Sequence, residues 1–305
     1  MKNIILGKTD MSVPQIAIGC MRMNRLTVSE AESFINTALE KGANFFDHAD
    51  IYGGGSSEEI FAKAVNMSPE VRERLIIQSK CGIRNGMFDF SKEYIISAVD
   101  GILKRLKTDY LDILLLHRPD ALVEPQEVAE AFDKLHSEGK VRHFGVSNHN
   151  PMQIMLLEKY LNQKIAANQL QFSITNATMV TAGLNVNMEN DAAVNRDGSV
   201  LDFCRLNDIT VQPWSPFQYG FFEGVFIGSD KYPALNETLG EIAKKYGVSP
   251  VTIALAWILR HPAKMQPVIG TMNEGRLKDC LKAADITLTR EEWYKIYLSA
   301  GNRLP

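Results

Sequence analysis

The chain has 305 residues and a formal net charge of −3, and 45% of its residues are hydrophobic. This length suits one large α/β barrel or two ordinary domains, and the hydrophobic content supports a sizeable buried core. The near-neutral charge gives no electrostatic basis for binding nucleic acid, because a phosphate-binding surface normally carries a basic excess. We therefore expect a small-molecule partner.

Neither the amino terminus nor the cysteines point to an exported or membrane protein. The first residues, MKNIILG, form too short an apolar run for a signal peptide, and no apolar span approaches membrane length. The cysteines show no CxxC motif and no metal-type spacing with histidine, which is typical of reduced intracellular thiols: Cys20, Cys81, Cys204 and Cys280. These features predict a cytoplasmic protein with no membrane or metal partner.

The chain opens with two short strands predicted over 4–13, which turn at residues 7–10. Beyond this hairpin, short apolar runs alternate with longer amphipathic segments. Eight runs are short and apolar enough to be strands buried on both faces, as a parallel sheet requires: 15–19, 44–47, 75–79, 112–116, 143–146, 166–170, 210–214 and 267–270.

The amphipathic segments between these strands are predicted helices. Ser29 has Glu32 three residues further on, which is the pattern of a capping box at the start of the first helix. Gly139 stands where a glycine is expected just past a helix C-terminus. The full series is 29–41, 91–106, 125–139, 151–160, 197–206, 234–246, 250–260 and 273–284.

Eight strands alternating with helices predict an α/β protein, a closed (β/α)8 TIM barrel, although an open doubly wound sheet has the same local pattern. No Gly/Ser-rich linker or charge block divides the chain, so residues 1–305 are expected to form one domain. Two connections are long: 175–196, after the sixth strand, is rich in asparagine, and 217–233, after the seventh, is rich in aromatic residues. Such loops are usually functional.

Polar residues gather at the carboxyl ends of the predicted strands. These ends share one face of a β/α barrel, where such enzymes build their active sites. A tyrosine with a pKa near 10 is a poor acid at neutral pH, but a nearby ammonium lowers that pKa. A carboxylate holds a buried lysine charged, and a histidine can orient a carbonyl oxygen. The four groups that protonate an oxygen while hydride reaches carbon are all present: Asp47, Tyr52, Lys80 and His117.

A series of motifs in this chain resembles the aldo-keto reductase family. Each motif is weak alone, but their order is specific and spans nearly the whole chain. They are FFDHADIYG at 45–53, SK at 79–80, LLLH at 114–117, GVSN at 145–148, NQ at 168–169, PWSP at 213–216 and VIGT at 268–271.

The resemblance implies roles for the four polar residues. Tyr52 would be the general acid–base, with Lys80 lowering its pKa and Asp47 pairing with that lysine. His117 would orient the substrate carbonyl. A partner of this kind is an aldehyde or ketone.

The resemblance also implies a nicotinamide cofactor in extended form across the rim, in keeping with the lack of a GxGxxG fingerprint. Ser147, Asn148 and Gln169 match positions that hydrogen-bond the carboxamide. Trp214 stands where the family places a ring, usually a tyrosine, stacked on the nicotinamide. Two residues that follow Trp214 in the sequence are also assigned to the cofactor: Ser215 and Phe217.

The adenosine end is expected where the eighth strand runs into a helix whose N-terminus can accept phosphate. Arg276 matches a family arginine that contacts the 2′-phosphate or adenine, which favours NADP(H) without excluding NAD(H). The chain departs from many relatives in lacking a basic residue at Gly270 and in having Asp279-Cys280 in place of a Glu-Asn pair. The residues assigned to this end are Gly270, Thr271, Asn273, Arg276 and Asp279.

Three functions remain open. The first is an NAD(P)H-dependent carbonyl reductase, monomeric by family default, and the second is a nucleotide-binding sensor or regulatory module with little turnover. The third is a barrel isomerase or lyase with a Schiff base on Lys80, which would need a neutral lysine. The expected pocket walls suggest an apolar or aromatic carbonyl compound: Met21, Met23, Ile83, Met87, Phe88 and the aromatic loop 217–226.

Overall fold

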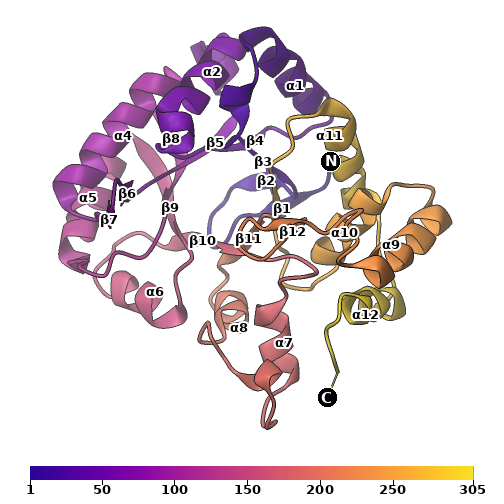
Figure 1. Cartoon of the computed structure of the whole chain (residues 1–305). Helices are drawn as coiled ribbons and strands as arrows, with labels where there is room; N and C mark the ends of the chain where they lie inside the picture. Colours follow the sequence, from indigo (N-terminus) through magenta and orange to yellow (C-terminus); the bar gives the residue numbers. More distant parts are fainter. Residues whose placement is uncertain (305) are drawn as a thin grey trace.

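A computed structural model describes residues 1–304 (Figure 1). Parallel strands close into a barrel in which each strand pairs with the next along the chain and the last pairs with the first. The predicted (β/α)8 TIM barrel is therefore confirmed. Its strands are β3 (Ala17–Gly19), β4 (Phe45–Asp47), β5 (Ile76–Cys81), β8 (Leu111–Leu116), β9 (Val141–Ser147), β10 (Ile165–Gln171), β11 (Thr210–Trp214) and β14 (Val268–Ile269).

The barrel strands match the predicted apolar runs to within two residues at each end because a strand covered on both faces needs apolar side chains throughout. In β8 all residues are buried, and in β3 and β4 the same holds. Three short hairpin pairs lie outside the barrel. The second pair, β6 (Ile83–Arg84) with β7 (Met87–Phe88), follows β5, and the third, β12 (Gln218–Tyr219) with β13 (Gly224–Val225), lies in the aromatic loop.

The first hairpin, β1 (Asn3–Ile5) with β2 (Ser12–Pro14), closes the amino end of the barrel. Its turn buries Leu6 and Val13 completely, in one cluster with inward side chains of the barrel strands. The Gly7 amide donates to Thr210 Oγ1 at 2.7 Å, and a Cβ at Gly7 would collide with the carbonyl oxygen of Ala166. Gly7 also has a φ of 51°, so this position requires glycine.

Helices form the outer ring around the barrel (Figure 1). The α-helices are α1 (Val28–Glu40), α2 (Ser56–Ala64), α3 (Pro69–Arg72), α4 (Lys92–Leu106), α5 (Pro125–Ser137), α6 (Pro151–Glu158), α7 (Thr178–Leu184), α8 (Val200–Leu206), α9 (Pro233–Tyr246), α10 (Pro250–Leu259), α11 (Glu274–Leu281) and α12 (Arg290–Ser299). Single 3-10 turns are η1 (Met23–Arg25), η2 (Tyr52–Gly55), η3 (Asp191–Ala193) and η4 (Lys282–Asp285).

The start of α1 corrects one prediction. The helix begins one residue earlier than expected, and its capping box joins Thr27 to Glu30 rather than Ser29 to Glu32. Thr27 and Ser29 are both possible N-cap residues within one turn. The N-cap is Thr27, because its side chain accepts a hydrogen bond from the backbone amide three residues further on. Helices α2, α3, α7 and α12 were not predicted.

The long connection 175–196 contains α7 and η3, so it is partly helical rather than an open loop. Thr181 on α7 forms a hydrogen bond at 2.8 Å with the hydroxyl of Tyr297 on α12. This connection therefore packs against the C-terminal helix. No helix within residues 1–304 is long and apolar enough to cross a membrane.

Candidate active site

Lys80 lies at the centre of the predicted polar cluster. Its ammonium donates to Asp47 Oδ2 at 2.8 Å, to the His48 carbonyl oxygen at 2.8 Å and to the Tyr52 hydroxyl at 3.1 Å. An ammonium has three donors, and all three are used. Lys80 is completely buried and Asp47 nearly so, while Tyr52 is partly exposed. Asp47 ends β4, Lys80 is near the end of β5 and Tyr52 opens η2, so the barrel brings these three together as predicted.

His117 follows β8 and lies beside the same tyrosine. The His117 and Tyr52 ring centroids are 6.1 Å apart, with the rings edge to face. Burial, followed by the charges of Lys80 and Arg118, holds the pKa of His117 well below its ordinary value. The imidazole is therefore neutral at physiological pH. A neutral ring can donate one hydrogen bond to an oxygen placed at the mouth of the barrel.

The charge states of Lys80 and Tyr52 follow from their mutual contact. Burial alone would lower the pKa of Lys80, but the charges of Asp47 and Tyr52 outweigh it and raise that pKa, so the lysine stays charged. Burial raises the pKa of Tyr52, and this exceeds the lowering by Lys80. Lys80 thus lowers the pKa of Tyr52 as expected, but the net shift is upward because desolvation of the phenolate is the larger effect. Tyr52 is protonated at neutral pH.

Asp47 is also held from inside the barrel, by residues that the sequence analysis missed. Gln78 donates to Asp47 Oδ1 at 2.6 Å and Gln169 donates to the same oxygen at 3.1 Å. Gln78 and Gln212 exchange hydrogen bonds at 2.9 and 3.1 Å, and Gln212 donates to Gln266 at 2.9 Å. The buried amides thus form a continuous hydrogen-bond network that ends on the Asp47 carboxylate.

Three of the residues assigned to the nicotinamide meet at the rim. The Asn148 amide donates to Ser147 Oγ at 2.8 Å, and Trp214 Nε1 donates to Asn148 Oδ1 at 3.1 Å. Asn148 and Ser215 have φ angles of 60° and 51°, a left-handed conformation that is costly outside glycine and is often found at functional sites. The Gln169 amide nitrogen donates to Asp47 Oδ1 at 3.1 Å.

The aromatic loop covers Trp214. Phe222 stacks on the indole, with ring centroids 5.8 Å apart and planes at 24°, and Phe221 meets it edge to face at 6.3 Å. Phe217 instead packs against the main hydrophobic core. Among the expected pocket walls, Met23 is completely buried and cannot face a substrate. Four others are at least partly exposed: Met21, Ile83, Met87 and Phe88.

The residues assigned to the adenosine end line the start of α11. Asn273 caps the helix by accepting from the Arg276 amide at 3.0 Å, and Arg276 Nε donates to Thr271 Oγ1 at 3.2 Å. Asp279, one turn later, pairs with Lys282 at 2.9 Å. Thr271, Asn273 and Arg276 therefore form one cluster, whereas Asp279 has a separate partner.

A second residue missed from the sequence supplies charge at this end. Arg22, in the connection after β3, donates from Nη1 to the Gly270 carbonyl oxygen at 3.1 Å. Its guanidinium would lie 3.5 Å from a Cβ at Gly270. A basic group thus reaches the position where the sequence has none of its own. The two residues are 248 apart in the chain, so only the closed barrel brings them together.

The profile of the Aldo/keto reductase family matches residues 15–297 of this chain. The chain belongs to this family. Carbonyl reduction is the general activity of aldo/keto reductases, so the protein is an oxidoreductase. This aldo/keto reductase is 34% identical to the uncharacterized oxidoreductase YcsN of Bacillus subtilis, over 94% of each chain. It is also 34% identical to the 6-dehydroglucose reductase of Novosphingobium aromaticivorans, over 98% of this chain and 96% of the relative.

Solved structures of aldo/keto reductases share the fold. A thermostable aldo-keto reductase in complex with the inhibitor epalrestat superposes with a TM-score of 0.79 and 27% identity, covering 98% of this chain and all of the other. Within residues 1–304 of this aldo/keto reductase, no three His, Cys, Asp or Glu side chains are grouped to hold a metal ion.

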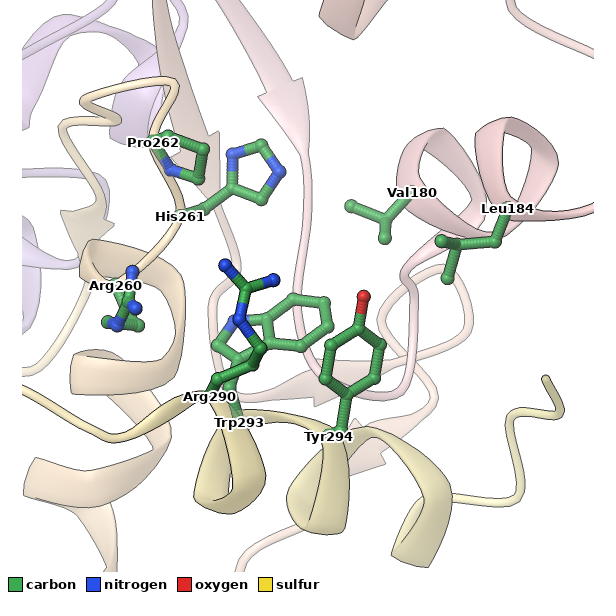
Figure 2. Close-up of a pocket in the computed structure, with 8 residues that line it drawn as sticks. All are labelled: Val180, Leu184, Arg260, His261, Pro262, Arg290, Trp293 and Tyr294. Carbon is green, nitrogen blue, oxygen red and sulfur yellow. The ribbon is translucent and has the colours of Figure 1, made fainter.

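A cavity of about 340 Å³ lies elsewhere in this aldo/keto reductase, between α7, α12 and the end of α10 (Figure 2). In Figure 2, Trp293 and Tyr294 extend from α12 toward Val180 and Leu184 on α7. None of the predicted site residues lines it. The complete lining is Val180, Leu184, Arg260, His261, Pro262, Arg290, Trp293 and Tyr294.

Proposed function

We propose that this aldo/keto reductase reduces aldehydes or ketones to alcohols with NADPH, and that Tyr52 donates the proton. The observation that carries the proposal is the 3.1 Å hydrogen bond between the charged Lys80 ammonium and the protonated Tyr52 hydroxyl. A protonated tyrosine can donate a proton, and the phenolate that remains is stabilised by the positive charge of the Lys80 ammonium beside it. Electrostatic stabilisation of developing charge is a large term in catalysis.

The chain's own residues have distinct parts in this step. His117, neutral, donates to the carbonyl oxygen and directs it toward the Tyr52 hydroxyl. Lys80 stabilises the phenolate, and Asp47 keeps the lysine charged and in place. The chemistry that a bound nicotinamide supplies is hydride transfer to the carbonyl carbon.

The rim residues fit such a cofactor. Trp214 offers a flat π-face, and the strained Asn148 backbone holds the amide that tethers its indole. Arg276 and Arg22 bring two guanidinium groups to the end of β14, where phosphates would bind. Two such charges favour NADP(H) over NAD(H). The Schiff-base alternative is disfavoured by the 2.7 Å ion pair that keeps Lys80 charged.

The substrate class follows in part from relatives. Two of them, each at least 32% identical over at least 89% of this chain, are named 6-dehydroglucose reductase. Sugar aldehydes therefore belong in the substrate panel together with aromatic aldehydes and diketones. The proposal also holds that the chain acts as a single-domain monomer in the cytoplasm, which four unpaired, buried thiols support.

The test mixes purified protein with NADPH and this panel and follows nicotinamide absorbance for wild type and Tyr52→Phe. We expect turnover in wild type and a loss of about 10²-fold or more in Tyr52→Phe, with unchanged NADPH binding. Equal turnover in both proteins contradicts the assignment of Tyr52. Cofactor binding without turnover of any substrate supports the sensor alternative, and borohydride trapping on Lys80 supports the Schiff base.

A further inference from the structure

Arg118 is a half-buried cation without a carboxylate partner. It follows His117 at the end of β8, and no ion pair or side-chain hydrogen bond within residues 1–304 includes its guanidinium. Its guanidinium carbon lies 5.7 Å from the centre of the Trp214 ring and 5.9 Å from that of Phe221. The group is thus held over aromatic faces at the mouth of the barrel.

The other shielded arginines each have a polar partner, which sets Arg118 apart: Arg22 and Arg260 donate to backbone carbonyl oxygens, and Arg72 and Arg105 form ion pairs. Arg72 contacts Asp112 at 2.7 Å, and Arg105 contacts the buried Glu58 at 2.7 Å. Partial burial of an unpaired charge is unfavourable, and cation–π contacts offset only part of that cost. The guanidinium remains charged at physiological pH. An unfavourable, partly buried charge without a partner is expected where a bound ligand supplies the missing anion.

The charge of Arg118 reaches the reacting groups. It contributes to the low pKa of His117, and Tyr52 in turn raises the pKa of Arg118 against the lowering by burial. Lys80 is paired with Asp47 at 2.7 Å, whereas no ion pair between described residues includes Arg118, so Arg118 is the cation near the reacting groups that has no carboxylate partner. An anionic group attached to the substrate would meet it there.

Arg118 starts from a different strand than the cluster proposed for the cofactor phosphates. In the barrel order, three strands lie between β8 and β14 in either direction, so the two strands are directly opposite each other. Arg118 follows β8, whereas the cluster proposed for phosphate follows β14. The Arg118 backbone is therefore opposite that cluster, while its side chain reaches across the mouth to Trp214 on β11, the strand that pairs with β14.

We propose that Arg118 binds a carboxylate of the substrate, so that the preferred substrates are oxo acids, aldehydes or ketones that carry a carboxylate across a short apolar spacer. This inference rests on the proposed function and narrows its substrate class. A guanidinium binds a carboxylate through two parallel hydrogen bonds, and the indole and phenyl rings beside Arg118 shield the pair from water. The aromatic surroundings match the apolar spacer.

The test compares acids with their methyl esters, which keep the carbonyl and remove only the charge. The pairs are 4-formylbenzoate with methyl 4-formylbenzoate and 4-oxobutanoate with its methyl ester, each at saturating NADPH. We expect wild type to prefer the acid in kcat/KM by about tenfold or more. Arg118→Met lowers kcat/KM for the acids by about 10- to 100-fold, mainly through KM, and changes the esters by less than about threefold. Arg118→Lys restores part of the preference.

Arg205→Met is the matched control, because it removes an exposed arginine that is paired with Asp202 on the same helix. It leaves the acid-to-ester ratio unchanged. NADPH affinity, read from quenching of tryptophan fluorescence, stays the same in Arg118→Met.

Two results overturn the inference while leaving carbonyl reduction intact. One is turnover of the esters with no preference for the acids in wild type. The other is an equal loss on acids and esters in Arg118→Met together with weaker NADPH binding. Calorimetric titration of the NADPH complex with 4-(hydroxymethyl)benzoate tests the site without turnover, and equal affinity in wild type and Arg118→Met contradicts it. Failure of the proposed function would instead show as no turnover on either member of any pair.

Discussion

Asp47 receives an ammonium from one side and two amides from another, and the amides fix which way its carboxylate faces. Gln78 donates to Oδ1 at 2.6 Å, and the Lys80 ammonium lies 2.8 Å from Oδ2 and 2.7 Å from Oδ1. Because Lys80 in turn holds the Tyr52 hydroxyl, a shift of Asp47 is passed on to the proposed proton donor. Gln78 is therefore a positioning residue that never touches substrate.

Gln78→Leu is expected to lower kcat about tenfold with little change in KM, because misplaced groups of an active site cost rate rather than uniform binding. Stability falls too, by about 1–3 kcal/mol, since Asp47 and Gln212 each lose a buried partner. Steady-state kinetics and urea unfolding measure both. Gln266→Leu is the control: it removes the amide that donates to the Pro14 carbonyl oxygen at the far end of the network, so stability falls and kcat is kept. Equal effects of the two variants on kcat would contradict the positioning role.

At this scale the sequence predicted the cluster but not its support. Asp47, Lys80 and Tyr52 could be placed because strand ends of a barrel share a face. Gln78 could not, since a lone glutamine inside an apolar run carries no sign of its partner, and Gln212 is 134 residues away. The net pKa of Tyr52 was also beyond reach, because it depends on how deeply the hydroxyl is buried.

Among the elements, the barrel strands and eight of the helices were predicted to within three residues, whereas α2, α3, α7 and α12 were not predicted. An apolar run is a property of a few adjacent residues, so the barrel strands could be found within two residues. Helix α2 follows three glycines with φ angles of 59°, 63° and 94°. Consecutive glycines predict a turn, so nothing in the sequence indicates that a helix begins directly after them. Helix α12 follows the eighth strand–helix pair, so the repeating strand–helix pattern does not predict it.

The N-terminus of α12 should have a measurable effect on stability. Thr289 Oγ1 accepts from the Glu292 amide at 3.1 Å while the Glu292 side chain accepts from the Thr289 amide at 2.8 Å. The helix then stacks Trp293 on Trp257, with centroids 4.8 Å apart. Thr289→Ala is expected to lower the free energy of unfolding by about 1 kcal/mol without affecting turnover. Urea unfolding measures this, and Thr289→Ser should recover the loss; if serine behaves as alanine does, the cap is not the cause.

Across the whole molecule, buried histidines make stability depend on pH. His48 is completely buried against Phe61, and burial, with the charge of Lys80, lowers its pKa to about 3. His149 and His261 are lowered to about 4, again chiefly by burial. Each is neutral in the fold and takes up a proton near its ordinary pKa of 6.5 only when unfolded. Their stabilisation is complete above pH 6.5 and is lost as the pH falls toward 4.

Asp50 has the opposite effect on stability. Burial and then the charge of Glu58 raise its pKa to about 6, so as the pH falls the folded protein binds this proton before the unfolded chain does. To isolate one group, we compare wild type with His48→Leu. Each linked proton changes the unfolding free energy by about 1.4 kcal/mol per pH unit. The variant should therefore show a shallower fall between about pH 6 and pH 4, by roughly that slope. Parallel curves from urea unfolding at each pH would contradict the assignment.

The β1–β2 hairpin closes the amino end of the barrel beneath the candidate site. Leu6 and Val13 fill this end, and every N–H of Lys80 is already bonded to Asp47, His48 or Tyr52, so Lys80 has no spare donor. In the proposed reaction, the proton that Tyr52 gives to the new alcohol would be replaced through the same mouth by which that alcohol departs. Reprotonation of Tyr52 and release of the product would then share one passage, and a second cycle would begin only after the first product has left it.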